Sequence, residues 1–146
     1  MSLTTWKVLG GALAAVCLIA AAACLVVGGC DACVQTADGG CVPMKCHYAV
    51  RAAALVEAMA ALSCAALCFV KCKVGRRWLA VSGIAGQALA LVVLYTPYVG
   101  ICANAAMKCH LTAHAVAVCA GIVAVGCCVA LAKADPTLAA LPKRGL

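Results

Sequence analysis

The chain has 146 residues, of which 68% are hydrophobic and 10% are charged, and its formal net charge is +7. A soluble domain of this length carries about a quarter charged residues, so this chain has too few polar side chains to cover a surface in water. Its basic residues lie between and after the apolar runs, a pattern typical of membrane topology rather than of a nucleic-acid-binding patch.

Four apolar runs are long enough to span a bilayer, whose hydrocarbon core of about 30 Å requires ~20 residues of helix. In chain order they cover residues 8–28, 49–70, 78–96 and 111–131. The first run is longer than the apolar core of a signal peptide, which has about 7–15 residues. We therefore expect an all-α fold, a single membrane domain made of a four-transmembrane-helix bundle in contact with the lipid bilayer.

The distribution of basic residues predicts how the helices are oriented. Basic side chains gather before the first run, between the second and third, and after the fourth: Lys7, Lys71, Lys73, Arg76, Arg77, Lys133, Lys143 and Arg144. The positive-inside rule assigns these segments to the cytoplasm. We expect a multi-pass protein of the cell membrane with both termini and the tail 135–146 in the cytoplasm. The loops 29–48 and 97–110 would lie outside.

A four-residue motif occurs twice, once at the start of each even-numbered run. Met44-Lys45-Cys46-His47 opens the second run, and Met107-Lys108-Cys109-His110 opens the fourth. A further cysteine precedes each copy, Cys41 in the first loop and Cys102 in the second. The repeat predicts two duplicated helical hairpins, related by a pseudo-two-fold axis along the membrane normal. Both motifs would then lie on the same outer face.

The repeated residues are soft metal donors. Cys, Met and His together suit Cu(I), and Cys with His also suits Zn(II). We expect a copper-like ion bound by Cys46, His47, Cys109 and His110, with Met44 and Met107 as supporting donors. Haem is an alternative cofactor, because Cys41 to His47 forms a stretched version of the C-x-x-C-H attachment motif. His and Met are also axial haem ligands.

Disulfide chemistry is a second interpretation of the outer cysteines. Six cysteines lie in or beside the outer loops: Cys30, Cys33, Cys41, Cys46, Cys102 and Cys109. Thiols outside the cytoplasm tend to be oxidised, so Cys41–Cys46 and Cys102–Cys109 could pin the loops of a structural membrane subunit. Cys30-Asp31-Ala32-Cys33 and the four-helix layout are similar to the DsbB-type quinone-linked oxidases and the vitamin K epoxide reductases. That likeness implies thiol–disulfide exchange and is one of architecture only.

Polar residues inside the apolar runs form a further set of candidates. Glu57 lies near the middle of the second run, where a charge costs on the order of 3 kcal/mol, and Gln87 lies at similar depth in the third. We expect a Glu57–Gln87 hydrogen bond between helices, and a proton or cation relay is the alternative. His114 shares a helical face with His110.

Cysteines also recur within the runs at helical spacing. Cys17 and Cys24 share one face of the first run, and Cys64 and Cys68 share a face with Glu57 in the second. Buried cysteine ordinarily acts as a small hydrophobe at helix contacts. A metal route across the membrane is the alternative interpretation.

The paired MKCH motifs resemble those of an uncharacterised bacterial family of small four-helix membrane proteins, and the resemblance covers nearly the whole chain. The family has no assigned activity and supplies no catalytic residue. Its members are often encoded beside ABC transporter permeases, which implies an accessory of an ABC transporter or of a larger membrane complex. The chain contains no phosphate loop, no Ser/His/Asp set and no paired carboxylates, so the sequence predicts neither an ordinary soluble enzyme nor a nucleic-acid partner.

Overall fold

The computed structural model describes residues 3–30, 33–96, 100–102 and 107–134. It contains four helices, α1 (Leu3–Val26), α2 (Lys45–Ala66), α3 (Lys73–Tyr95) and α4 (Lys108–Ala134). Each is long and apolar enough to cross a membrane. The predicted all-α class and the four-helix bundle are therefore confirmed.

Each helix begins before the apolar run that predicted it. α1 begins at Leu3 rather than near residue 8, and α4 begins at Lys108 rather than near residue 111. Hydropathy marks only the apolar window, whereas helical hydrogen bonding continues through lysines whose long side chains reach interfacial water. As a result, Cys46 and Cys109 lie in the first turns of α2 and α4 and not in loops.

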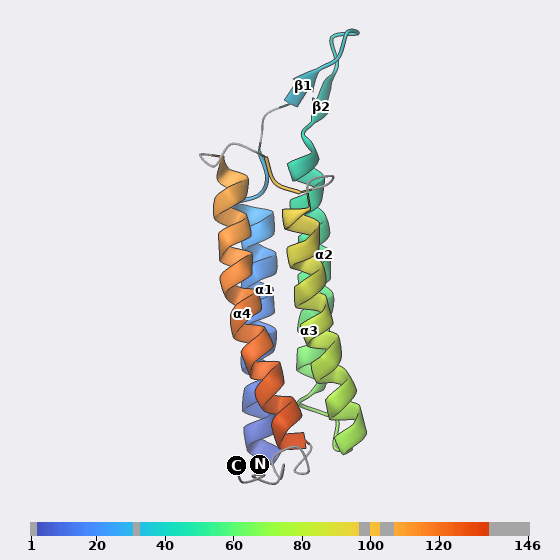
Figure 1. Ribbon diagram of the computed structural model, residues 1–146, viewed down its shortest axis with the longest axis vertical. Coiled ribbons are helices and arrows are strands. Elements are labelled where there is room, and N and C mark those ends of the chain that lie inside the picture. Colours follow the sequence, from blue (N-terminus) through green and yellow to red (C-terminus); the bar gives the residue numbers. More distant parts are fainter. Residues whose placement is uncertain (1–2, 31–32, 97–99, 103–106, 135–146) are drawn as a thin grey trace, which may run out of the picture.

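The helices form an antiparallel up-and-down bundle (Figure 1). Each helix packs against the one before it, and α4 packs back against α1. α2 and α4 therefore stand on the diagonal of the bundle and begin at the same end, and this is the end that carries the repeated motifs.

Most buried side chains of the bundle are small, and many of the exposed ones are large and apolar. Ala20, Ala53 and Ala90 are fully buried, whereas Leu18, Leu55 and Val125 are each more than half exposed. In a membrane the lipid is as apolar as leucine, so helices associate through close packing of small side chains. The distribution fits a bundle surrounded by lipid.

A short β-hairpin extends from the motif-bearing end beyond the start of α2 (Figure 1). Strands β1 (Cys33–Gln35) and β2 (Cys41–Pro43) pair antiparallel, with Val34 opposite Val42. The turn between them includes Gly39 at φ 75°, a conformation that favours glycine. From the sequence, this segment was expected only as part of the loop 29–48.

The opposite end of the bundle is basic. α1 begins there and α2 ends there. Lys71 lies in the connection to α3, and Lys73 and Arg76 lie in the first turn of α3. The Arg76 guanidinium lies 4.5 Å from the centre of the Trp6 ring, and its Nε donates a hydrogen bond to the Val70 carbonyl at 2.8 Å. The basic side chains thus lie at the end away from the repeated motifs.

Candidate metal centre

Four cysteine sulfurs converge where α2 and α4 begin. The Sγ atoms of Cys30, Cys46, Cys102 and Cys109 all lie within 4.8 Å of one another. The closest pairs are Cys46–Cys102 at 3.3 Å, Cys30–Cys109 at 3.5 Å and Cys30–Cys102 at 3.6 Å. We call these four residues the thiol cluster. Cys102 is half-buried, and the other three are at most 5% exposed.

The spacing of the thiol cluster suits one tetrahedral ion. A metal–sulfur distance of about 2.3 Å places the sulfurs of a tetrahedral site about 3.8 Å apart. The closest sulfur pairs here are a few tenths of an ångström shorter, so a small outward movement would admit an ion. An iron–sulfur cluster is several atoms across and needs its cysteines further apart. All-sulfur tetrahedral sites are typical of thiophilic ions.

The repeated motifs place Cys46 and Cys109 in equivalent positions. Each is the second residue of its helix. The His47 backbone N–H donates to the Met44 carbonyl at 2.9 Å, and that of His110 donates to the Met107 carbonyl at 3.0 Å. Both copies therefore form the same first turn. The unpaired N–H groups and the positive dipole end of a helix stabilise a thiolate there.

Two glycines and a threonine position Cys30. Gly28 ends α1 with φ at 69°. Gly29 passes so close to α2 that a Cβ there would lie 2.8 Å from the His47 Cα. The Thr112 hydroxyl of α4, which is fully buried, donates to the Gly28 carbonyl at 2.9 Å. The segment before Cys30 is thus fixed against both helices of the cluster.

A histidine holds Cys102 in place. The His110 Nε2 donates a hydrogen bond to the Cys102 carbonyl at 2.7 Å. The neighbouring Ile101 N–H donates to the Leu94 carbonyl of α3 at 2.9 Å. His110 therefore orients a cysteine of the cluster through its backbone, and its ring is not one of the converging donors.

The surroundings of Cys30 and Cys102 favour neutral thiols in the absence of a cation. Burial raises the pKa of the Cys30 thiol, and its hydrogen bond with Cys109 raises the pKa further. Burial and the neighbouring Cys46 likewise raise the pKa of Cys102. Four thiolates so close together repel one another, whereas a bound cation neutralises that repulsion and binds cysteine in its thiolate form.

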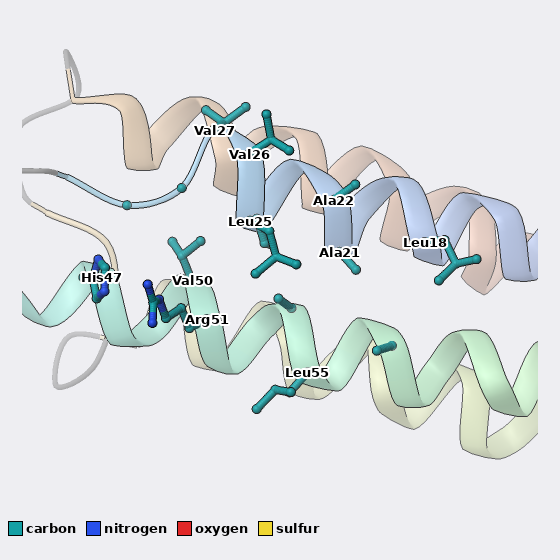
Figure 2. Close-up of a pocket in the computed structure, with 15 residues that line it drawn as sticks. Leu18, Ala21, Ala22, Leu25, Val26, Val27, His47, Val50, Arg51 and Leu55 are labelled. Carbon is teal, nitrogen blue, oxygen red and sulfur yellow. The ribbon is translucent and has the colours of Figure 1, made fainter.

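Some predicted site residues lie inside the cluster and others beside it. Cys46 and Cys109, predicted as ligands, are members, and Met44 and Met107 pack against it. The His47 side chain lies elsewhere: with Arg51, one turn further along α2, it lines a groove of about 790 Å³ between α1 and α2 (Figure 2). His114 is exposed on α4, with its ring 6.4 Å from that of His110.

Cys30 and Cys102 were expected only as disulfide or redox candidates. From the sequence, Cys102 was expected to be the counterpart of Cys41, because each is a cysteine that precedes a repeated motif. In the structure Cys102 is equivalent to Cys30 instead: Cys30 follows α1, and Cys102 follows α3. Each helical hairpin thus supplies one cysteine after its first helix and one at the start of its second.

The remaining outer cysteines lie on the β-hairpin. In its register Cys33 lies opposite Pro43, and Gln35 lies opposite Cys41; the side chains of Cys33 and Cys41 lie outside the described residues. The other twelve cysteines are free thiols. Cys102 and Cys109, expected as one alternative to form a disulfide, are both free and both belong to the cluster.

The predicted intramembrane hydrogen bond is present. The Gln87 Nε2 of α3 donates to the Glu57 Oε2 of α2 at 3.0 Å. Both side chains are buried, at 2% and 0% exposure. This bond joins two neighbouring helices in the apolar interior.

Comparison with known proteins assigns the chain to a family. Searches of the curated proteins and of the solved structures found no match. The model of one family, described as "Domain of unknown function (DUF4418)", matches residues 8–133 and so covers all four helices. The chain therefore belongs to the DUF4418 family.

Proposed function

We propose that this protein binds one thiophilic metal ion, Zn(II) or Cu(I), through Cys30, Cys46, Cys102 and Cys109. The observation that carries the proposal is the convergence of four sulfurs within 4.8 Å from segments far apart in the chain. Thiolates select soft and borderline ions. Haem is less well supported, because the donors that converge are sulfurs and the two motif histidines are not among them.

The proposed location is the cell membrane, with the thiol cluster at the outer face. Four apolar helices support a multi-pass membrane protein. The basic end would face the cytoplasm by the positive-inside rule. In an oxidising compartment a bound ion would also protect the four thiols, and a protein that captures such an ion could serve a transporter or a larger membrane complex.

Thiol–disulfide exchange is a second candidate, supported by one feature of the cluster. Its two closest contacts, Cys46–Cys102 and Cys30–Cys109, share no residue. Two disulfides could therefore form at once. Each would require an acceptor such as a membrane quinone, which takes two electrons and two protons to become the quinol as one S–S bond forms.

Metal analysis separates the two candidates. The full chain would be purified in detergent without oxygen and challenged with a chelator, as wild type, Cys46→Ser and the control Cys128→Ser, whose cysteine is exposed on α4. We expect wild type and Cys128→Ser to keep the tightest-bound ion and Cys46→Ser to lose it. Retention by Cys46→Ser of as many ions as wild type retains would contradict metal binding at the cluster. Metal-free wild type that regains four labelled thiols on reduction would favour the redox candidate.

A further inference from the structure

The interior of the bundle holds a second group of chemically active side chains. They come from all four helices: Cys17 of α1, Glu57 and Cys64 of α2, Gln87 of α3 and Cys127 of α4. Gln87 is 2% exposed, and the other four are completely buried. Ionisable residues are rare inside membranes and usually mark a functional pathway. The proposed function of the thiol cluster uses none of these residues.

These side chains contact one another. The Cys64 thiol interacts with those of Cys17 and Cys127. The Gln87 Nε2 lies 3.5 Å from the Cys17 Sγ and 3.0 Å from the Glu57 Oε2. Gly83 of α3 leaves room for two of the thiols, because a Cβ there would lie 3.0 Å from the Cys127 Sγ and 3.5 Å from the Cys64 Sγ.

Two oxygen atoms in this group have no hydrogen-bond partner among the described residues. They are the Oε1 atoms of Glu57 and Gln87, and both are buried. An unsatisfied buried polar group costs about 1–3 kcal/mol. The Gln87 oxygen can only accept, so its missing partner is a donor or a cation. The Glu57 oxygen lacks the same kind of partner when the carboxyl is ionised, and it lacks an acceptor when the carboxyl is protonated. Packing of cysteines as small hydrophobes accounts for the thiols, but it does not account for these two oxygens.

We propose that the bundle contains a second binding station for the thiophilic ion, formed by Cys17, Cys64 and Cys127 beside the Glu57–Gln87 pair. The inference rests on the proposed function, because the thiol cluster would deliver the ion. Each thiol that coordinates the ion loses its proton. A divalent ion that displaces two protons, from two thiols or from one thiol and Glu57, leaves the station electrically neutral, which an apolar interior favours. The thiols that do not coordinate the ion then keep their protons.

Further cysteines extend this arrangement toward both ends of the bundle. Cys24 and Cys119 belong to the packed layer that also includes Val50 and Val116, and Ile101 joins that layer to the thiol cluster. Toward the basic end, the Cys68 thiol donates to the Lys7 carbonyl at 3.3 Å. The two stations would thus be stages on one route through the protein, along which an ion is exchanged for protons.

Counting bound ions tests the inference. Metal-free full chain in detergent would be titrated without oxygen with Cu(I), and in a parallel series with Zn(II), against a chromophoric chelator. We expect one of these ions to bind wild type and the control Cys128→Ala with two equivalents. Cys64→Ala and Cys46→Ser should bind one equivalent each, and the variant carrying both changes should bind none. Glu57→Gln, which keeps the shape of the side chain, should weaken the second equivalent at least tenfold.

The outcomes separate this inference from the function on which it depends. One equivalent in wild type that is lost in Cys46→Ser would overturn the second station and leave the thiol cluster intact. Two equivalents in folded Cys64→Ala, or a second equivalent of unchanged affinity in folded Glu57→Gln, would overturn it as well. No bound ion in wild type would overturn both proposals. In proteoliposomes of phosphatidylethanolamine and phosphatidylglycerol with an indicator inside, Cys64→Ala should take up the ion at least tenfold more slowly than Cys128→Ala.

Discussion

The Sγ atoms of Cys46 and Cys102 lie 3.3 Å apart although 56 positions separate these residues in the chain. This contact joins the start of α2 to the segment between α3 and α4. The Cys30–Cys109 contact joins the segment after α1 to the start of α4. Each contact therefore links the first helical hairpin to the second, and an ion bound to all four sulfurs would cross-link the outer end of the bundle.

This cross-link predicts that the ion stabilises the fold. A ligand that binds only the folded state contributes about 4 kcal/mol at a concentration one thousand times its Kd. We expect Zn(II) or Cu(I) to raise the unfolding temperature of the detergent-solubilised protein and a chelator to lower it. Cys46→Ser should show a much smaller rise than Cys128→Ser, measured by circular dichroism. Equal rises in these two variants would argue against binding at the cluster.

The two motif histidines should differ in their effect on metal affinity. His110 holds the Cys102 backbone, and residues that orient metal ligands typically contribute 10–100-fold to affinity. His110→Ala should therefore weaken binding by roughly that factor. His47→Ala, a matched change at the same position of the other motif, should leave the affinity nearly unchanged. A larger loss in His47→Ala, measured by chelator competition, would restore His47 as a ligand.

Gly29 should be required for the cluster because it lies against the backbone of α2. A Cβ at Gly29 would lie 2.8 Å from the His47 Cα and 3.0 Å from the Cys46 carbonyl oxygen. Gly29→Ala should force the segment that carries Cys30 away from Cys46, and we expect metal affinity to fall by at least tenfold.

The control for this change is Gly11→Ala, because a Cβ at Gly11 would meet nothing within 4 Å beyond its chain neighbours and the local backbone of its own helix. Alanine is favoured over glycine in a helix by about 1 kcal/mol, so this variant should bind the ion normally and unfold at the same or a higher temperature. Equal affinity in Gly29→Ala and Gly11→Ala would show that the close approach of Gly29 to α2 does not position Cys30.

The Glu57–Gln87 bond should contribute measurably to stability. Interhelical hydrogen bonds in membranes contribute about 0.6 kcal/mol on average and up to about 1.7. Gln87→Leu should cost more, about 1–3 kcal/mol, because it leaves the Glu57 carboxyl without a partner. Glu57→Leu combined with Gln87→Leu should cost less than the sum of the two single changes, measured as unfolding in denaturing detergent. Strictly additive costs would show that the two side chains do not interact.

The helices and the intramembrane bond could be predicted from the sequence because hydropathy and membrane depth determine both. Apolar length predicts a spanning helix, and equal depth placed Glu57 opposite Gln87. Hydropathy does not report hydrogen bonding, so the apolar runs begin several residues after the helices do. Cys46 and Cys109 precede the runs but lie inside the first turns of the helices.

The membership of the thiol cluster could not be predicted from local sequence. Distance along the chain favoured Cys41 as the counterpart of Cys102, because each precedes a repeated motif. In the structure the counterpart is Cys30, which follows α1 as Cys102 follows α3. Gly28, Gly29 and Thr112 determine this path through contacts between distant segments. The same limit applies to His47 and His110. Both follow a cluster cysteine, but only His110 reaches the Cys102 carbonyl.

X-ray absorption fine structure at the edge of the bound metal tests the central claim most directly. For the purified full chain carrying one ion, we predict a first shell of four sulfur atoms at about 2.3 Å and no nitrogen. Cys46→Ser should not show this four-sulfur shell. A first shell that contains imidazole nitrogen, or fewer than three sulfurs in wild type, would contradict an ion held by Cys30, Cys46, Cys102 and Cys109.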